Sequence, residues 1–292
     1  MPRLSIFTNR AFIATVFIMA FTFVSGSAQN FCGRVVDENG QPLPYSTARV
    51  QKRPIATMSD SAGNFSLPMT GLYKKDTLTV AYMGYMPLSI AATELVADSA
   101  YCFRLTPMPT ALNEVTVGRT KGFKAKKQGN KRNNGMFRCF INGNTAGDTF
   151  GYEVHAKKNR RMLLDKVGFY FNEGENQMRQ MKFRINVYDM NGVKKGPTTK
   201  FVSILPKPIY FNYESGAETS GKFVYSLPDY IVLPTDAVVA IEFLEDLADS
   251  CLYFKGNMLG KKTWSRNLLD GEWDTSPFST PFFIECVEET LK

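Results

Sequence analysis

The sequence has 292 residues, a formal net charge of +8 at pH 7 and an aromatic content of 13%. This length is sufficient for two domains of ordinary size. The single histidine, His155, excludes a zinc site made of several histidines. The sequence contains no Cys-x-x-Cys pair, glycine-rich phosphate loop or Gly-x-Ser-x-Gly nucleophile motif. Aromatic and β-branched residues recur in short runs between Gly, Pro, Asn and Asp, which is typical of an all-β chain.

The first 28 residues have the pattern of a secretory signal peptide. Arg3 and Arg10 precede an uncharged apolar run at 11–24, and small residues lead to an expected cleavage between Ala28 and Gln29. The alternative is a membrane anchor, which needs about 20 apolar residues, more than this run supplies. We therefore expect an exported protein whose mature chain has no transmembrane helix.

Short alternating segments follow, and they define a first domain at 29–106. Phe31 to Val36 alternates between two faces and ends at Asn39-Gly40, a pair that favours a tight hairpin turn. Residues 91–97 are compatible with a helical turn. The spacing predicts a seven-stranded sandwich, whose clearest strands are expected at 31–36, 47–52, 56–59, 65–67, 76–82 and 101–105.

Three blocks of this domain resemble the carboxypeptidase-regulatory-like domain. They are GRVVDENGQPLP from Gly33, ATMSDSAGNFSL from Ala56 and LTVAYMGY from Leu78. The resemblance implies a transthyretin-like sandwich that is an accessory to other proteins and carries no catalytic residues of its own. It also implies a Gram-negative cell envelope, so we expect the protein in the periplasm or at the outer membrane and cell surface.

The segment Ala111–Gly118 (ALNEVTVG) resembles one that follows this domain in TonB-dependent outer-membrane transporters. There it engages an energy-coupling partner by strand addition. Because this sequence ends at Lys292 without a barrel, we do not expect a transporter. Two interpretations remain, a connecting strand or a docking segment of an outer-membrane complex.

We expect residues 107–135 to form a flexible linker, because they combine low hydrophobicity with high charge. Between residues 119 and 138 there are eight basic residues and no acidic one. Two interpretations of this charge remain. It keeps the linker solvated, or it attracts the segment to anionic envelope polymers or lipid phosphates. Nucleic acid is not an expected partner, since no recognition motif accompanies the charge.

Residues 136–292 are expected to form a larger, jelly-roll-like β-sandwich. In the clearest strand, Phe183, Ile185 and Val187 face one way while Lys182, Arg184 and Asn186 face the other. Val167–Phe171 and Leu227–Pro234 resemble parts of the C-terminal region of envelope proteins that begin with the same regulatory-like domain. Strands are expected at 179–189, 223–227, 237–244, 251–254 and 281–287.

Catalytic chemistry has weak support in the sequence. A glycosidase needs two carboxylates, and Glu153, Glu242 and Glu285 lie in strand-like segments. Carboxylates on an outer sheet face explain the same pattern. His155 lacks a recognisable nucleophile and orienting acid, so a structural or surface role is expected. We therefore predict a protein that is not an enzyme and that has no cofactor and no bound metal.

Disulfides are permitted in an oxidising envelope compartment. Cys32 and Cys102 lie on the outward phase of the first and last strands of the first domain, and they are the best candidate pair. Cys139 and Cys286 share the phase of neighbouring apolar residues and are expected to be buried. Five cysteines leave at least one thiol unpaired, and Cys251 or Cys286 is expected to pack as a free buried thiol.

Trp264 and Trp273 lie at either end of a loop-like segment, 261–274, and exposed rings there would stack on sugars. The alternative is that both rings fill one end of the core, since tryptophan is highly buried on average. The sequence favours a non-catalytic envelope module that binds a glycan or an envelope protein. A scaffold that docks through 111–118 is the alternative, and a carboxylate-based hydrolase is the third hypothesis.

Overall fold

The computed structural model describes residues 30–69, 72, 74–95, 100–109, 116–117, 125–129, 137–143, 145–157, 159–171, 180–191, 193, 201–214, 216, 221–256, 263–269, 271–276 and 282–290. In these ranges every regular element is a β-strand except one 3-10 turn, η1 (Ala92–Glu94), which confirms the all-β prediction. No helix in the described ranges has the length and hydropathy needed to cross a bilayer. The expected signal peptide, with Ala28 and Gln29, lies outside these residues.

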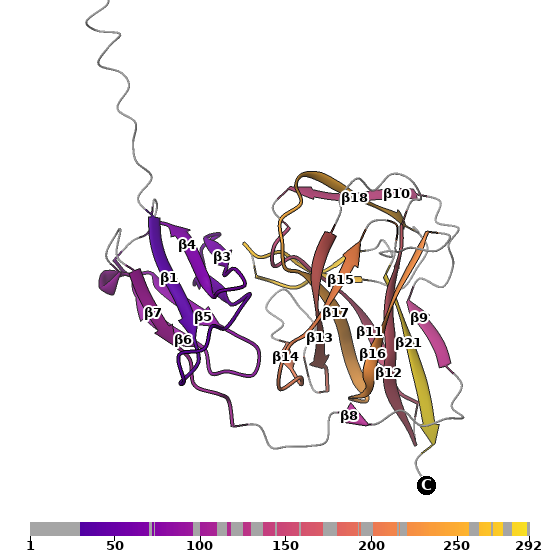
Figure 1. Ribbon diagram of the computed structural model, residues 1–292. Helices are drawn as coiled ribbons and strands as arrows, with labels where there is room; N and C mark the ends of the chain where they lie inside the picture. Colours follow the sequence, from indigo (N-terminus) through magenta and orange to yellow (C-terminus); the bar gives the residue numbers. More distant parts are fainter. Residues whose placement is uncertain are drawn as a thin grey trace, which may run out of the picture.

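The first domain is a sandwich of two sheets, shown in indigo and purple in Figure 1. One sheet has the order β4-β1-β7 and the other β3-β2-β5-β6, so the expected seven strands are confirmed. Phe31, Phe65 and Phe103 meet in the core, and a side chain on Gly33 would approach the last two rings within 2.6 Å. The strands are β1 (Asn30–Val36), β2 (Thr47–Val50), β3 (Ala56–Met58), β4 (Asn64–Pro68), β5 (Thr77–Ala81), β6 (Leu88–Ala91) and β7 (Ala100–Arg104).

The second domain is a larger sandwich, with a five-stranded sheet D of order β8-β16-β12-β21-β9 facing a seven-stranded sheet F. Sheet F has the order β14-β13-β17-β11-β19-β20, with β15 also paired to β13. Both sheets contribute to one core, for example Phe169 and Ile284 from sheet D with Phe183 and Val239 from sheet F. The strands of sheet D are β8 (Thr116–Val117), β9 (Ala125–Gly129), β12 (Arg160–Tyr170), β16 (Lys222–Leu233) and β21 (Phe282–Thr290).

Sheet F carries the outer face that meets the first domain, and a separate strand pair closes one end of the sandwich (Figure 1). That pair is β10 (Phe137–Gly143) with β18 (Ala248–Gly256). The strands of sheet F are β11 (Thr149–His155), β13 (Gln180–Asp189), β14 (Val202–Ser203), β15 (Ile209–Glu214), β17 (Asp236–Phe243), β19 (Thr263–Arg266) and β20 (Asp274–Ser276). Their positions agree with the strands expected at 179–189 and 237–244.

Two strands of sheet D come from the segment expected to be a linker. β8 pairs with β16, and β9 pairs with β21 from Phe283↔Gly129 to Val287↔Ala125 (Figure 1). The prediction of a flexible linker over 107–135 is therefore wrong for these residues. Low hydrophobicity was a misleading signal here, because edge strands are commonly rich in lysine, which discourages pairing with other chains.

The two domains are in direct contact through Tyr45 of the first domain. Lys182 on β13 donates a hydrogen bond from Nζ to the Tyr45 hydroxyl at 2.9 Å, and Tyr210 on β15 packs edge-on against the Tyr45 ring at 5.6 Å. The Tyr210 and Tyr82 hydroxyls lie 3.3 Å apart, and Arg49 donates to the Leu269 carbonyl at 2.8 Å. These contacts position the first domain over the outer face of sheet F.

A buried ion pair lies beneath this contact. Arg184 on β13 is directly opposite Glu242 on β17, and its Nε and Nη2 donate to Glu242 Oε2 at 2.9 and 2.8 Å. Asn186 donates to the same oxygen at 2.8 Å, while Arg184 Nη1 donates to the Tyr45 carbonyl at 3.1 Å. Arg184 is 6% exposed and Glu242 2%, because the first domain covers this outer face of sheet F.

Candidate functional site

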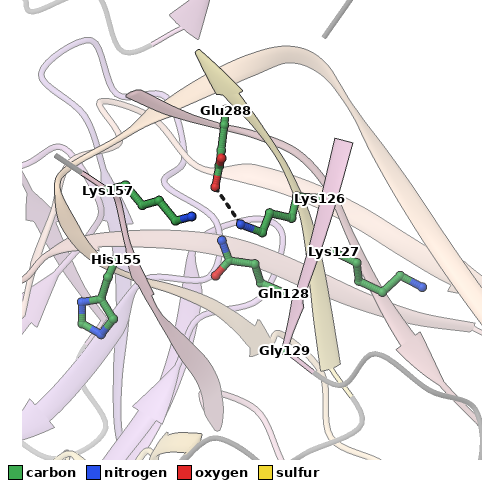
Figure 2. Close-up of a pocket in the computed structure, with 7 residues that line it drawn as sticks. All are labelled: Lys126, Lys127, Gln128, Gly129, His155, Lys157 and Glu288. Atoms are coloured by element: carbon green, nitrogen blue, oxygen red, sulfur yellow. Dashed lines mark hydrogen bonds and ion pairs between the residues drawn. The ribbon is translucent and has the colours of Figure 1, made fainter. Parts of the chain in front are cut away.

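A pocket of about 330 Å³ opens at the edge of the second sandwich, between β9 of sheet D and the end of β11 in sheet F (Figure 2). Most of its lining groups are basic or polar. The volume is at the lower end of the range for small-molecule sites. The lining residues are Lys126, Lys127, Gln128, Gly129, His155, Lys157 and Glu288.

Strand alternation decides which side chains of β9 enter the pocket. Lys126 and Gln128 are paired with Cys286 and Ile284, whose side chains are in the core, so they point to the inner side of sheet D. Lys127 points to the outer side, as Figure 2 shows. Gly129 is the last residue of β9 and has φ +85°. A Cβ added there would lie 2.9 Å from the Phe282 carbonyl oxygen.

Glu288 is the acidic group of the pocket. Lys126 donates a hydrogen bond from Nζ to Glu288 Oε1 at 3.0 Å, and Arg160 pairs with the other carboxylate oxygen. The hydrogen bond from Lys126, followed by that from Arg160, holds the pKa of Glu288 below its ordinary value despite an opposing contribution from burial. Lys157 is exposed, and no carboxylate among the described residues forms an ion pair with it. Lys126 and Lys157 line the pocket with a single carboxylate, Glu288, whose charge Arg160 also offsets from outside the lining, so the pocket is basic.

His155 lies at the rim with its ring turned away from Glu288 (Figure 2). Its Nδ1 is 2.6 Å from Asp236 Oδ1, and its Nε2 is 3.3 Å from Glu153 Oε2. Glu153 also accepts a hydrogen bond from Trp264 Nε1 at 2.8 Å. The imidazole is thus oriented by two carboxylates, and its exposed position agrees with the expected surface role.

The two tryptophans do not form an exposed sugar platform. Trp264 is 3% exposed and Trp273 4%, and both pack with Tyr188 and Phe201 in a small cluster on the outer side of sheet F. Trp264 lies on β19, directly opposite Gly151, so the expected loop at 261–274 is also partly a strand. The prediction of ring stacking on a glycan at these positions is wrong, because both indoles are covered, as the alternative prediction states.

The carboxylates considered for hydrolysis lie in three different environments. Glu242 is in the buried pair with Arg184, Glu153 contacts Trp264 and His155, and Glu285 lies 3.4 Å from Lys166 on the outer side of sheet D. Burial raises the pKa of Asp148 to about 6, but Asp148 precedes β11 at the end opposite the pocket. In the described ranges, no group of three or more His, Cys, Asp or Glu side chains is placed to hold a metal.

The expected disulfide is not formed. β1 and β7 are neighbours, but Cys32 pairs with Ala100, so Cys102 lies two residues farther along the parallel strand. An offset of about 6.6 Å along the strand and 4.8 Å across it separates the Cα atoms by roughly 8 Å, beyond the reach of a disulfide. Cys32 and Cys102 are both exposed free thiols.

The remaining cysteines were expected to be buried or unpaired. Cys286 is fully buried and free, as expected, and burial raises the pKa of its thiol. Cys251 is a half-buried free thiol. The side chain of Cys139 lies outside the described part of the chain.

The docking segment 111–118 is described only at Thr116 and Val117. These residues pair with Ile231 and Tyr230 as β8, so one backbone edge of the segment is already used within the protein. The structure thus supports the connecting-strand interpretation for these two residues. Docking through the rest of the segment stays a prediction.

Of the residues that line the pocket, only His155 stands out individually in the sequence, while Lys126 and Lys127 belong to the basic segment. Gln128 and Gly129 lie within that segment, and Glu288 directly follows the strand expected at 281–287, but nothing in the sequence pointed to Lys157. A search of curated proteins found no significant match to this chain. A family model for the CarboxypepD_reg-like domain matches residues 31–117, which extends past the first sandwich to include β8. The N-terminal part of the chain is therefore similar to the CarboxypepD_reg-like domain, a non-catalytic β-sandwich.

Proposed function

We propose that this protein is an exported, non-catalytic binding module of the cell envelope, and that the pocket beside β9 binds an acidic glycan. The observation that carries this proposal is the basic pocket itself, which Lys126 and Lys157 line and whose one carboxylate, Glu288, is paired with Lys126 and Arg160. The signal-peptide pattern and the match to the CarboxypepD_reg-like domain support the envelope and the non-catalytic role.

The chemistry of the pocket favours a sugar that carries a carboxylate. The ammonium groups of Lys126 and Lys157 would bind the carboxylate, while Gln128 and Glu288 offer a donor and an acceptor for hydroxyl groups. A pocket of about 330 Å³ accommodates one or two sugar rings. The two cations and two hydrogen-bonding groups within one small pocket fit a short acidic glycan, which is why we propose it over the envelope-protein alternative.

The test is a calorimetric titration of the chain from Gln29 with trigalacturonic acid, using maltotriose as the neutral control. We expect binding of the acidic trisaccharide alone, with an affinity that falls as salt is raised. Replacing Lys157 with Met should weaken binding about fivefold, the effect of removing one charge near 4 Å from the ligand in water.

Lys75→Met is the matched control, since it removes one exposed positive charge from the first domain. Its affinity for trigalacturonic acid should equal that of the unsubstituted protein. The proposal would be refuted by equal binding of maltotriose, by no binding at low salt, or by a loss in the Lys75 variant as large as in the Lys157 variant.

A further inference from the structure

A second basic cluster lies on the outer side of sheet D, behind the pocket. Lys127 from β9 and Lys222 from β16 both extend over the ring of Phe283 on β21, with Nζ atoms 4.4 and 5.2 Å from its centroid. Lys127 also donates a hydrogen bond to the Tyr170 hydroxyl at 2.8 Å. Lys127 also lines the pocket, but Figure 2 shows its side chain extending away from Lys126 and Gln128, so its ammonium group lies on the other side of β9.

The sheet is shaped to hold these lysines. Gly168 on β12 leaves space that the Phe283 ring occupies, and an added Cβ there would lie 2.4 Å from that ring and 2.5 Å from the Phe223 carbonyl oxygen. Phe283 is fully buried although it is on the outer side of the sheet. The lysine stems contribute to this cover, since long charged side chains bury their methylene groups on apolar surfaces.

The charges of the cluster do not cancel. Lys166 lies 3.4 Å from Glu285 and 3.8 Å from Asp165, so it is near both carboxylates of the cluster. Lys222 has one longer contact, 3.8 Å to Glu285, and no carboxylate among the described residues forms an ion pair with Lys127. Burial and then the charge of Lys127 lower the pKa of Lys222 below its ordinary value, against the attraction of Glu285. Two ammonium groups are thus held together at an energetic cost.

We propose that Lys127 and Lys222 form a binding site for a phosphate group. A bound anion between the two ammonium groups would offset their mutual repulsion and replace the water lost on burial. A phosphate has three terminal oxygens and a charge near −2 at neutral pH, so it accepts from both lysines at once. The site does not rest on the proposed glycan function, because it lies on the other side of β9.

The experiment is a nuclear magnetic resonance titration of the lysine side chains in the full mature chain with inorganic phosphate. We expect phosphate to shift the Lys222 and Lys127 signals and to raise the pKa of Lys222, because the bound anion favours its charged form. Lys222→Met keeps an apolar stem over Phe283 and should weaken phosphate binding about fivefold, while Lys75→Met, which equally lowers the net charge, should not.

A second arm identifies the source of the phosphate. The protein is sedimented with vesicles of phosphatidylglycerol or of phosphatidylcholine. Binding to the phosphatidylglycerol vesicles alone would assign the site to lipid headgroups, provided that Lys222→Met abolishes this binding. Phosphate binding without vesicle binding would assign it to a soluble or polymer-borne phosphate. Lys222 and Lys127 signals that stay unchanged on adding phosphate would overturn the proposal, as would equal affinities of Lys222→Met and the unsubstituted protein.

Discussion

Replacing Glu242 with alanine is expected to lower the free energy of unfolding by about 3–5 kcal/mol, because it leaves the buried charge of Arg184 without its partner. Arg184 donates two hydrogen bonds to Glu242 Oε2, and Asn186 donates a third. Alanine removes the acceptor of all three hydrogen bonds. The donor residues are buried, since Arg184 is 6% exposed and Asn186 2%. Chemical denaturation followed by tryptophan fluorescence measures the change, since both tryptophans are in this domain.

Two further variants separate the loss of the ion pair from the loss of a carboxylate in general. Glu289→Ala removes the partner of Arg161 in a more exposed pair and should cost about 1 kcal/mol or less. Arg184→Leu combined with Glu242→Leu should be less destabilised than Glu242→Ala, because no unpaired charge stays buried. A cost below 1 kcal/mol for Glu242→Ala would show that the first domain does not cover this face in solution.

Replacing Gly84 with alanine is expected to separate the two domains. Gly84 has φ +80°, and an added Cβ would lie 2.2 Å from the carbonyl oxygen of Pro206, which belongs to the second domain. Because that neighbour is backbone, the clash is relieved by moving the domains apart. Small-angle X-ray scattering should show a larger radius of gyration, and the Tyr45 and Tyr82 contacts should be lost.

Gly40 provides the matched control for this prediction. It has the same φ, +80°, but nothing lies within 4 Å of an added Cβ. Gly40→Ala should therefore show only the backbone strain of a left-handed residue, about 1–2 kcal/mol, with an unchanged radius of gyration. Equal scattering curves for both variants would mean that Gly84 is not at a fixed domain contact.

The strands could be predicted because their signal is local. Phe183, Ile185 and Val187 alternate with polar residues, and this period alone gives β13 and its core-facing side. The burial of the polar side could not be predicted, because it depends on a contact between Arg184 and Tyr45, which are 139 residues apart in the chain. Alternation distinguishes two faces of a strand, but it does not identify a second domain that covers the outer face.

The pocket could be predicted only in part. The excess of basic residues between 119 and 138 was compatible with a solvated linker or with an anionic partner, but composition alone could not show that Ala125–Gly129 joins β21 as an edge strand. Pairing across more than 150 residues brings Lys126 to Glu288, and β11 then adds His155 and Lys157. The indoles of Trp264 and Trp273 were the more conspicuous sequence feature, and tertiary packing buries both.

The most direct test of the binding account is the affinity of Glu288→Gln for trigalacturonic acid. Glu288 is the carboxylate of the pocket and pairs with Lys126 and Arg160, so its neutralisation makes the pocket more positive while glutamine keeps a hydrogen-bonding side chain of the same length. We expect binding about fivefold tighter than in the unsubstituted protein, opposite in sign to Lys157→Met. Unchanged or weaker binding by a folded Glu288→Gln protein would contradict an acidic ligand in this pocket.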